Sequence, residues 1–282
     1  MKKIYIFLCL CFISACTYIE QSDEIWIKNA QNEALYLKVD GVENASSQKL
    51  VFLQHGLASN MNHQVIQQIK KAFLANHYVV ISFDSRYSLG NSGNDVRKVR
   101  LSTFREDLKT VISWAKTQPF YHEPFALSGH SLGGASVLQY SAQHPDQINL
   151  LIPVTPVISG QLWETSCQTN MADFCHQWQQ NGSFNYTDPH NHKTAVIPYD
   201  VITDCKSYNA YKLAPKIMAK TLIVSAENDN IIPPTEVQKL IKSFKNNNIS
   251  AIIPASGHNF EDKQNQTDLY HTVYDFIKSS NF

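Results

Sequence analysis

Short apolar runs alternate with longer amphipathic segments through most of this 282-residue chain. The runs contain few charged residues, as parallel strands do when both of their faces are buried. They are Leu50–Leu53, Tyr78–Phe83, Phe125–Leu127, Asn149–Val154, Thr221–Ser225 and Ser250–Ile253. Helical patterns separate most of them, over residues 62–75, 103–117, 132–143, 235–246 and 265–279. This alternation predicts an α/β fold with a largely parallel sheet and a ligand site at the carboxyl ends of its strands.

Two segments depart from the alternation. Near the start, "EIWIKNA" and "ALYLKVD" are short alternating segments separated by the polar "QNE", which predicts a hairpin. Residues 155–215 are too long for a simple connection and contain the turn-rich stretch "NGSFNYTDPHNH". We therefore expect residues 155–215 to form an insertion over the sheet, within a domain that spans residues 25–282.

The first residues have the features of an export signal. A positively charged start, "MKK", precedes an apolar run over residues 4–15 that is too short to span a bilayer comfortably. The run ends in "FISAC", which resembles the bacterial lipobox and so implies that Cys16 is lipidated and becomes the mature N-terminus. An ordinary signal peptide, cleaved after a small residue, is the alternative.

On the lipobox interpretation, residues 1–15 are a lipoprotein signal peptide and residues 16–24 are a tether. The protein would then be anchored by lipid to a bacterial membrane, facing the periplasm or the cell surface. The residue after the cysteine is Thr17 and not an aspartate. By the same resemblance, this slightly favours the outer membrane.

The charge balance narrows the class of partner. The chain has 24 basic and 24 acidic side chains, whereas nucleic-acid-binding proteins normally show a basic excess. We therefore expect a small-molecule partner and no nucleic acid.

Beyond Cys16, the expected mature domain contains Cys167, Cys175 and Cys205. Export permits disulfides, and an odd number of cysteines leaves one thiol unpaired. Cys167 and Cys175 are nearest in sequence, but the sequence leaves the pairing open.

The stretch "ALSGHSLGGAS" contains Gly129-His130-Ser131-Leu132-Gly133 between an apolar run and a helical pattern. It matches G-x-S-x-G, in which a sharp turn between a strand and a helix exposes a serine. Gly129 and Gly133 would let the strand and helix approach closely, and Ser131 would lie at the helix N-terminus, where negative charge is favoured. The alternative is a serine that caps a helix in a glycine-rich turn.

A serine nucleophile needs a base to take its proton and an acid to orient that base. "TLIVSAENDNIIPP" is a strand pattern followed by a polar loop with Asp229, and "AIIPASGHNF" is a strand pattern followed by His258. The order predicts Ser131 as nucleophile, His258 as general base and acid, and Asp229 as the group that orients His258. Glu227, two residues before Asp229, is the alternative acid.

Acyl transfer also needs donors for the tetrahedral oxyanion. The backbone N–H of Leu132, directly after the serine, is one candidate. The second is the backbone N–H of Leu57, in the loop "FLQHGLASN" after an early strand. We expect His55 to brace that loop and to take no proton from the substrate.

Together these blocks resemble the α/β-hydrolase superfamily over roughly residues 50–280. "HGLASN" resembles its oxyanion loop, "FDSRYSLGNS" its D-x-R-G-x-G-x-S stretch, "GHSLGG" its nucleophile elbow, "ENDNIIPP" its acid loop and "SGHNF" its histidine loop. Tyr87 stands where the family usually has glycine, with one extra residue before Gly90, in a loop that borders the pocket in the family.

The resemblance implies an α/β-hydrolase fold, with a mostly parallel eight-stranded sheet, flanking helices and a small cap insertion at about 155–215. It is strongest to small-capped esterases, monoacylglycerol lipases and serine aminopeptidase-like members.

Three other groups of residues are candidates for binding roles. His176, His190 and His192 lack a fixed metal-ligand spacing, so we expect no metal, and nothing in the motifs implies a cofactor.

For Asp84 and Arg86 we expect a structural ion pair and no contact with a substrate charge. For Trp163, Phe174 and Trp178 we expect the insertion's own small core and no acyl pocket.

The expected function is a serine hydrolase that cleaves carboxylic esters of a small-molecule acyl substrate through an acyl-enzyme on Ser131. A peptidase, a thioesterase or an acyltransferase would use the same three residues, so these alternatives stay open. A non-catalytic binding protein of this type would usually lack one of the three, and this chain has them all.

Overall fold

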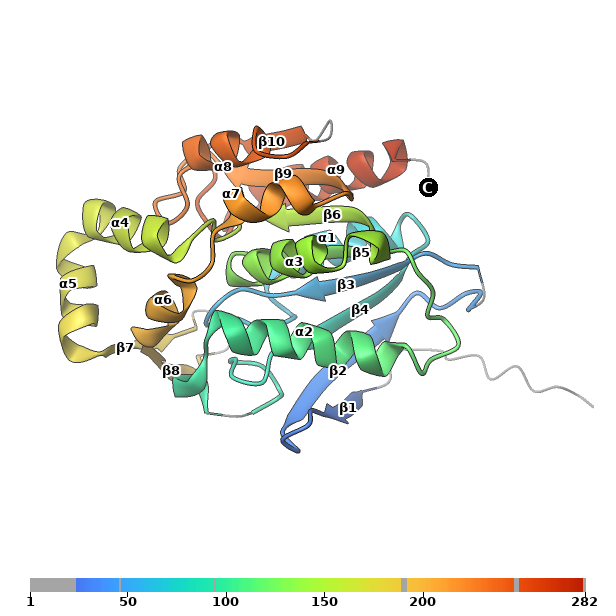
Figure 1. Cartoon of the computed structure of the whole chain (residues 1–282), viewed down its shortest axis with the longest axis horizontal. Coiled ribbons are helices and arrows are strands. Elements are labelled where there is room, and N and C mark those ends of the chain that lie inside the picture. Colours follow the sequence, from blue (N-terminus) through green and yellow to red (C-terminus); the bar gives the residue numbers. More distant parts are fainter. Residues whose placement is uncertain (1–23, 46, 94, 189–191, 246–248, 281–282) are drawn as a thin grey trace, which may run out of the picture.

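The computed structural model describes residues 24–45, 47–93, 95–188, 192–245 and 249–280 (Figure 1). The expected signal peptide, Cys16 and all but the last residue of the expected tether lie outside this part of the chain. None of the described helices is both long and apolar enough to cross a membrane.

Eight strands form one mostly parallel sheet in the order β1-β2-β4-β3-β5-β6-β9-β10, which confirms the predicted fold class. β1 and β2 form the expected antiparallel hairpin, β2 pairs antiparallel with β4, and the remaining pairs are parallel. The strands are β1 (Ile25–Lys28), β2 (Ala34–Asp40), β3 (Leu50–Gln54), β4 (Val79–Asp84), β5 (Phe125–His130), β6 (Ile148–Val154), β9 (Lys220–Ala226) and β10 (Ile249–Ile253).

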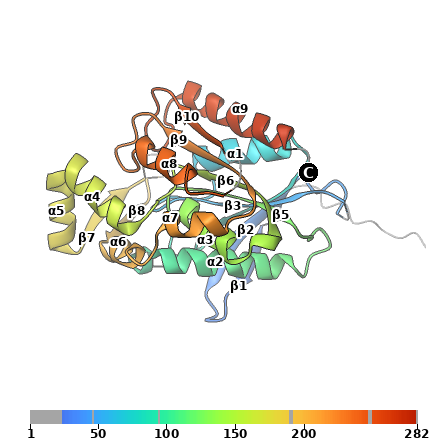
Figure 2. The same ribbon diagram turned by 45° about the horizontal axis from the view of Figure 1, so that its top comes forward.

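Helices cover both faces of this sheet (Figure 1; Figure 2). α1 and α9 pack together on one face, and α2 and α3 pack together on the other. The helices that flank the sheet are α1 (Gln64–Leu74), α2 (Leu101–Ala115), α3 (Leu132–Gln143), α8 (Pro234–Ile241) and α9 (Lys263–Ser279), with short 3₁₀ turns over Val96–Lys98, Pro145–Gln147 and Ala214–Lys216.

The central strands are buried on both sides because each face of the sheet has its own apolar core. In β3, Val51 and Leu53 pack into the core under α1 and α9, whereas Leu50 and Phe52 pack into the core under α2 and α3. Successive strand residues point to opposite faces, so both sets must be apolar. This two-sided burial is why the strands appear in the sequence as continuous apolar runs.

The prediction of a helix over residues 235–246 was too long, since α8 ends at Ile241. The polar residues that follow Ile241 include a serine and asparagines. Both types favour a helix less than the leucine and lysine that precede them, which explains the earlier end.

The segment between β6 and β9 forms a separate group of elements that begins directly after the carboxyl end of β6. Figure 1 and Figure 2 show α4, α5, β7 and β8 together at one end of the molecule. β7 and β8 form a two-stranded antiparallel sheet. The elements are α4 (Gly160–Asn170), α5 (Ala172–Asn181), β7 (Ser183–Thr187), β8 (Thr194–Pro198), α6 (Asp200–Cys205) and α7 (Ala210–Leu213).

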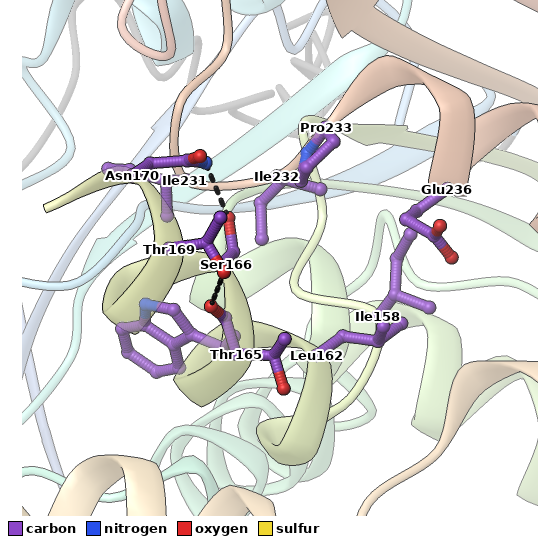
Figure 3. Close-up of a pocket in the computed structure, with 11 residues that line it drawn as sticks. Ile158, Leu162, Thr165, Ser166, Thr169, Asn170, Ile231, Ile232, Pro233 and Glu236 are labelled. Carbon is purple, nitrogen blue, oxygen red and sulfur yellow. Dashed lines mark hydrogen bonds between the residues drawn. The ribbon is translucent and has the colours of Figure 1, made fainter. Parts of the chain in front are cut away.

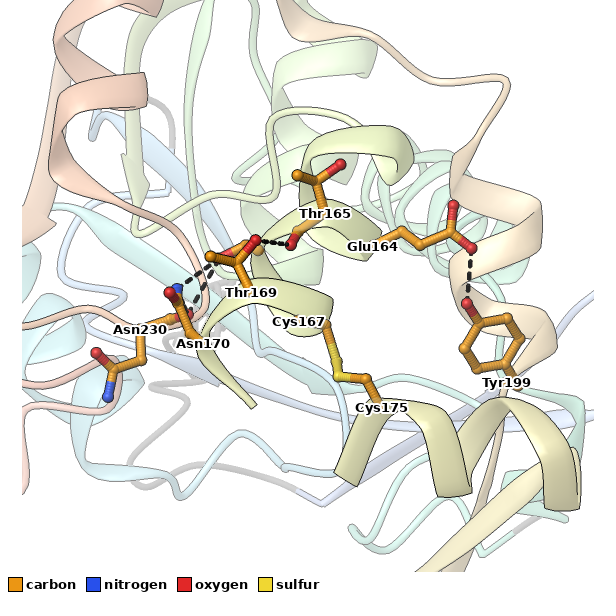
Figure 4. Close-up of a disulfide and its surroundings, with 9 residues drawn as sticks. Glu164, Thr165, Cys167, Thr169, Asn170, Cys175, Tyr199 and Asn230 are labelled. Atoms are coloured by element: carbon orange, nitrogen blue, oxygen red, sulfur yellow. Dashed lines mark hydrogen bonds between the residues drawn. A yellow bond between two sulfur atoms is a disulfide. The ribbon is translucent and has the colours of Figure 1, made fainter. Parts of the chain in front are cut away.

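A disulfide joins α4 to α5 in this segment. It links Cys167 to Cys175, whose Cα atoms are 5.8 Å apart, and leaves Cys205 as a buried free thiol (Figure 4). Glu164, also on α4, accepts a 2.7 Å hydrogen bond from the hydroxyl of Tyr199, just before α6 (Figure 4). These links hold α4 to α5 and to the start of α6.

The expectation that Asp84 pairs with Arg86 was wrong in its partners, although both side chains are structural. Asp84 accepts backbone N–H groups of Met61 at 2.8 Å and Asn91 at 2.7 Å. Asp84 is the last residue of β4 and Arg86 lies in the loop after it, and different elements supply their partners.

Arg86 instead pairs with carboxylates from two other elements. It bonds to Asp107 and Glu106 on α2 and to Glu33 before β2. Burial alone would lower the pKa of Arg86, but attraction to Asp107 and hydrogen bonds to all three carboxylates raise it. The charged Arg86 therefore fastens the loop after β4 to α2.

Removal of this guanidinium tests how much the fold depends on it. Arg86 is 2% exposed, so Arg86→Ala leaves Asp107 buried without its cation and should lower the free energy of unfolding by about 3–5 kcal/mol. Urea denaturation of Arg97→Ala provides the control, because Arg97 pairs with Asp95 at the surface. Equal midpoints for the two variants would contradict this role of Arg86.

Candidate active site

Ser131 lies at the turn between β5 and α3, with a backbone φ of +53°. Its N–H donates to the Val154 carbonyl at 2.9 Å, and its carbonyl accepts from the Val157 N–H at 3.1 Å. A non-glycine residue in this conformation costs of order 1–3 kcal/mol and persists only where its surroundings enforce it. The bonds to the end of β6 and to the segment after it provide that enforcement.

Two glycines make the turn sterically possible. A Cβ at Gly129 would lie 2.5 Å from the Gly133 carbonyl oxygen. A Cβ at Gly133 would lie 2.4 Å from the carbonyl oxygens of Gln54 and His55. Both positions therefore require glycine, because real Cβ atoms do not approach backbone so closely.

The structure brings Ser131, His258 and Asp229 together. His258 Nε2 lies 2.9 Å from Ser131 Oγ, and His258 Nδ1 lies 2.7 Å from Asp229 Oδ2. In the neutral tautomer that fits both partners, Nδ1–H donates to the carboxylate and Nε2 accepts from the hydroxyl. This arrangement lets the serine transfer its proton to the imidazole.

Asp229 is held on both carboxylate oxygens. Oδ2 accepts from His258, and Oδ1 accepts the backbone N–H groups of Ile231 and Ile232, each at 2.8 Å. The side chain is fully buried, so water does not compete for these bonds. The carboxylate orientation is therefore fixed by its own loop.

Glu227, the alternative acid, is not directed at His258. Its Oε2 accepts the backbone N–H of Ala255 at 2.7 Å, and its side chain is exposed. It links the loop after β9 to the loop after β10.

Leu57 and Leu132 lie on the two sides of Ser131. A Cβ at Gly56 would lie 3.1 Å from Ser131 Cβ, so the loop that carries Leu57 packs directly against the serine. Neither the Leu57 N–H nor the Leu132 N–H has an acceptor within the described part of the chain. The two backbone donors predicted for the oxyanion are therefore not engaged by another described residue.

His55 braces the Leu57 loop from beneath. Its Nδ1 lies 2.7 Å from the Gly56 carbonyl oxygen, and its Nε2 accepts the Ser85 N–H at 2.9 Å. The ring is completely buried, which lowers its pKa. A neutral imidazole that donates from Nδ1 satisfies both bonds.

His130, the residue before Ser131 in the G-x-S-x-G motif, is a site residue whose role the motif did not predict. It is buried directly before Ser131, and its Nε2 lies 3.1 Å from the backbone carbonyl oxygen of His258. Because a carbonyl only accepts, Nε2 carries a proton and fastens the His258 loop to the turn. Nδ1 is buried without a hydrogen-bond partner among the described residues.

The His130 ring is neutral in the folded protein. Burial, reinforced by repulsion from His258 and His63, holds its pKa well below the ordinary value. The ring of His63 stacks on it at 5.5 Å between centroids, and the ring of His258 lies 5.1 Å away. A charge on His130 would be unsatisfied at Nδ1 and close to two other imidazoles.

A cavity of about 350 Å³, called here the catalytic cavity, opens above Ser131 and His258. Leu57, His63 and His130 contribute to its floor, and aromatic side chains of the segment between β6 and β9 contribute most of its walls. These aromatic residues are Trp163, Phe174, Trp178, Phe184 and Tyr186.

The assignment of Trp163, Phe174 and Trp178 to an internal core alone was therefore wrong. Trp178 does pack against Trp163 and Phe174, with ring centroids 6.3 and 5.8 Å apart. The same rings also face the catalytic cavity. Phe184, 4.9 Å from Trp178, was missed because its short strand lies within the stretch "NGSFNYTDPHNH", whose polar residues indicated turns.

None of the remaining candidates within the described residues lines the catalytic cavity. His176 and His192 are exposed, His190 lies outside the described residues, and no metal-ligating group of three is found in the part of the chain that the structure describes. No residue of the segment 84–92 is among the described residues that line the catalytic cavity, so that loop does not border it here. Tyr87 instead donates its hydroxyl to Glu33 at 2.6 Å.

Comparison with known proteins gives a family match over just over half of the chain. A family model described as serine aminopeptidase, S33, matches residues 45–200. A monoacylglycerol lipase of Mycolicibacterium smegmatis is 30% identical over 115 residues, which cover 39% of each protein. An uncharacterised hydrolase of Bacillus subtilis is 29% identical over 86 residues, 30% of each protein. The matches thus span about a third of the length of these curated relatives.

Solved structures share the fold along most of the chain at low identity. Est1E of Butyrivibrio proteoclasticus, with ferulic acid bound, has a TM-score of 0.72 and 17% identity over 91% of this chain and 98% of that one. An esterase of Pyrococcus furiosus has a TM-score of 0.70 and 17% identity, with 92% and 90% covered. Mouse alpha/beta hydrolase domain-containing protein 10 has a TM-score of 0.69 and 16% identity, with 91% and 99% covered.

The buried neutral state of His130 predicts a loss of stability in acid. An unfolded histidine titrates near pH 6.5, so below that pH the unfolded state binds a proton that folded His130 does not. Stability should then fall by about 1.4 kcal/mol per pH unit for such a group as the pH decreases. In urea denaturation between neutral pH and pH 5, His130→Asn should lose stability less steeply than the wild type.

His271→Asn serves as the control, because His271 is exposed on α9. That variant should follow the wild-type pH dependence. The assignment fails if His130→Asn retains the full wild-type slope.

Proposed function

The chain belongs to the serine aminopeptidase S33 family of hydrolases, and from this premise we propose that it cleaves carboxylic esters of small-molecule acyl substrates. The observation that carries the proposal is the continuous hydrogen-bonded series from Ser131 through His258 to Asp229 at the floor of an apolar cavity. The monoacylglycerol lipase and the esterases among the similar proteins support an ester as the bond that is cleaved.

In the proposed reaction, Ser131 Oγ attacks the ester carbonyl while His258 Nε2 takes the hydroxyl proton. The imidazolium that forms is stabilised by Asp229 through Nδ1–H. Collapse of the tetrahedral intermediate breaks the carbonyl–alkoxy bond, and His258 returns the proton to the departing alcohol. A water molecule, deprotonated by His258, then hydrolyses the acyl-enzyme and restores Ser131.

The N–H groups of Leu57 and Leu132 supply the donors for the oxyanion in this scheme. Both lie on backbone fixed by the close contact of the Gly56 loop with the serine turn. Fixed donors need no reorganisation as charge develops on the carbonyl oxygen, and one such donor contributes about 3–4 kcal/mol to transition-state binding.

The elements over residues 155–215 act as the cap of this enzyme in our proposal. Their aromatic side chains line the cavity above the serine and offer a water-poor surface to a hydrocarbon acyl group. This lining favours an ester of an apolar acid over a peptide, whose polar backbone would need hydrogen-bond partners there.

Replacement of Ser131 and of Asp229 provides the direct test. Ser131→Ala and Asp229→Asn should each lower kcat on short p-nitrophenyl esters by about 10⁴-fold or more, because each interrupts the proton transfer. Fluorophosphonate, which reacts only with an activated serine, should label the wild type and not Ser131→Ala.

Glu227→Gln is the matched control for Asp229→Asn, since Gln can still accept the Ala255 N–H. Its kcat should stay close to the wild-type value. A panel of esters, thioesters and aminoacyl amides identifies the preferred bond, and faster cleavage of an amide or thioester than of any ester would refute the ester assignment.

Lipidation of Cys16 is a separate proposal, supported by the "FISAC" sequence after a charged and apolar start. Two acyl-bearing groups on one cysteine would give stable anchoring, whereas a single chain would not. The protein would then face the periplasm or the cell surface from a bacterial membrane.

Expression of the full chain in a bacterial host tests the anchor. The wild type should fractionate with membranes and incorporate labelled palmitate, whereas Cys16→Ser should do neither. Cys205→Ser is the matched control, because Cys205 is a buried thiol of the folded domain. Recovery of the wild type in the soluble periplasmic fraction without label would disprove the anchor.

A further inference from the structure

A second cavity of about 200 Å³ lies beside the catalytic cavity, between α4 and the segment that follows β9. Figure 3 shows Leu162, Thr165 and Ser166 of α4 on one side, with Ile232 and Pro233 across from them. Ile158 and Ile231 complete an aliphatic surface. We call this space the side cavity.

α4 is the wall between the two cavities, and its helical repeat divides its side chains between them. Trp163 and Cys167, four residues apart on α4, line the catalytic cavity together with Met171, which directly follows the helix. Leu162, Ser166 and their neighbours on the adjacent stripe line the side cavity. Of the described residues, only Trp163 and Ile231 line both.

The position of this wall is fixed by polar contacts and a covalent link. Ser166 Oγ and Asn170 Nδ2 bond to the Asn230 carbonyl at 3.1 and 2.8 Å, next to Asp229. The disulfide from Cys167 also fastens α4 to α5 (Figure 4). With α4 held in place, the side chains that line both cavities are the ones that can separate them.

Trp163 has the size and placement to make that separation. It is 7% exposed and packs edge-to-face against Trp178, with ring centroids 6.3 Å apart. No hydrogen bond of its indole N–H to another described residue is found, so the ring is placed by packing alone. Ile231, the other shared residue, belongs to the loop that holds Asp229 through its backbone N–H.

The chemistry of the side cavity matches a hydrocarbon chain. Ile158, Leu162, Ile231, Ile232 and Pro233 supply its apolar surface. The acidic side chain on its rim, Glu236, is already bonded to the Tyr211 hydroxyl and to Lys239. Its charge is thus satisfied within the protein and is not directed at a ligand.

We propose that Trp163 sets the length of the acyl group this enzyme accepts, by closing the catalytic cavity against the side cavity. The proposal rests on the proposed ester hydrolysis and adds the substrate class: acyl chains short enough to end at the Trp163 ring. Removal of the ring joins the cavities and lets the distal methylenes of a longer chain pack against the aliphatic surface.

Binding of saturated alkanoates, from butanoate to hexadecanoate, tests this independently of the bond that is cleaved. Calorimetry on wild type should show affinity that rises with chain length and then stops rising. In Trp163→Ala the rise should continue to longer chains, with a gain of about tenfold for every two further methylenes that become buried. The optimum p-nitrophenyl ester should shift in the same direction.

Two variants control for a general loosening of the cap. Phe174→Ala also removes an aromatic ring from the catalytic cavity, but Phe174 does not line the side cavity, so the chain-length limit should stay where it is. Trp163→Ala combined with Leu162→Trp refills the side cavity and should restore the wild-type limit. Melting temperatures establish that each variant is folded.

The inference is overturned if folded Trp163→Ala keeps the wild-type limit for alkanoates, or if Phe174→Ala extends it equally. Absence of ester turnover in the wild type would instead contradict the proposed function. The alkanoate profile would still decide the role of Trp163 in that case, since it requires no catalysis.

Discussion

The chain passes through Ser131 in a left-handed backbone conformation that the surrounding backbone enforces from three directions. The serine bonds to Val154 at the end of β6 and to Val157 just beyond it. Gly133 presses the start of α3 against the end of β3, where a Cβ would meet two carbonyl oxygens. Because these contacts involve backbone, they fix the serine, the Leu57 loop and the start of the segment after β6 in one unit.

The loops that carry the acid and the histidine are fastened to this unit and to each other. His130, adjacent to the serine, holds the His258 carbonyl. The Asn228 N–H donates to the Ser256 carbonyl at 2.8 Å, and Glu227 accepts the Ala255 N–H. The distance between Ser131 and His258 is therefore determined by hydrogen bonds outside the proton-transfer series. In the proposed reaction, the residues that hold the catalytic groups in place are therefore different from those that transfer the proton.

The sequence allowed prediction of the sheet, its flanking helices and the order in which Ser131, Asp229 and His258 follow successive strands. Parallel strands place their carboxyl ends at one edge, so the order alone was enough to bring the three together. Contacts between segments far apart in the chain could not be predicted. Arg86 contacts Glu33 in the hairpin turn, 53 residues away in the sequence, and His130 contacts His258, 128 residues away. No local sequence pattern predicts contacts over such separations.

Alternative roles for single residues were also settled only by three-dimensional packing. Glu227 and Asp229 are both acids in one polar loop, and the direction of each side chain decides which one meets the imidazole. The Cys167–Cys175 bond similarly depends on how α4 and α5 turn against each other.

The cap segment shows why the substrate is the hardest property to predict from such a sequence. Its few large side chains form both its internal packing and the cavity walls, as the rings of Trp163 and Trp178 do. A segment as small as the cap buries little apolar surface by itself. The disulfide and the hydrogen bonds to Asn230 therefore add to the stability that aromatic packing provides. Aromatic residues selected for stability and for ligand shape look identical in a sequence. Only the packing of these rings against each other and around the catalytic cavity shows that they have both roles.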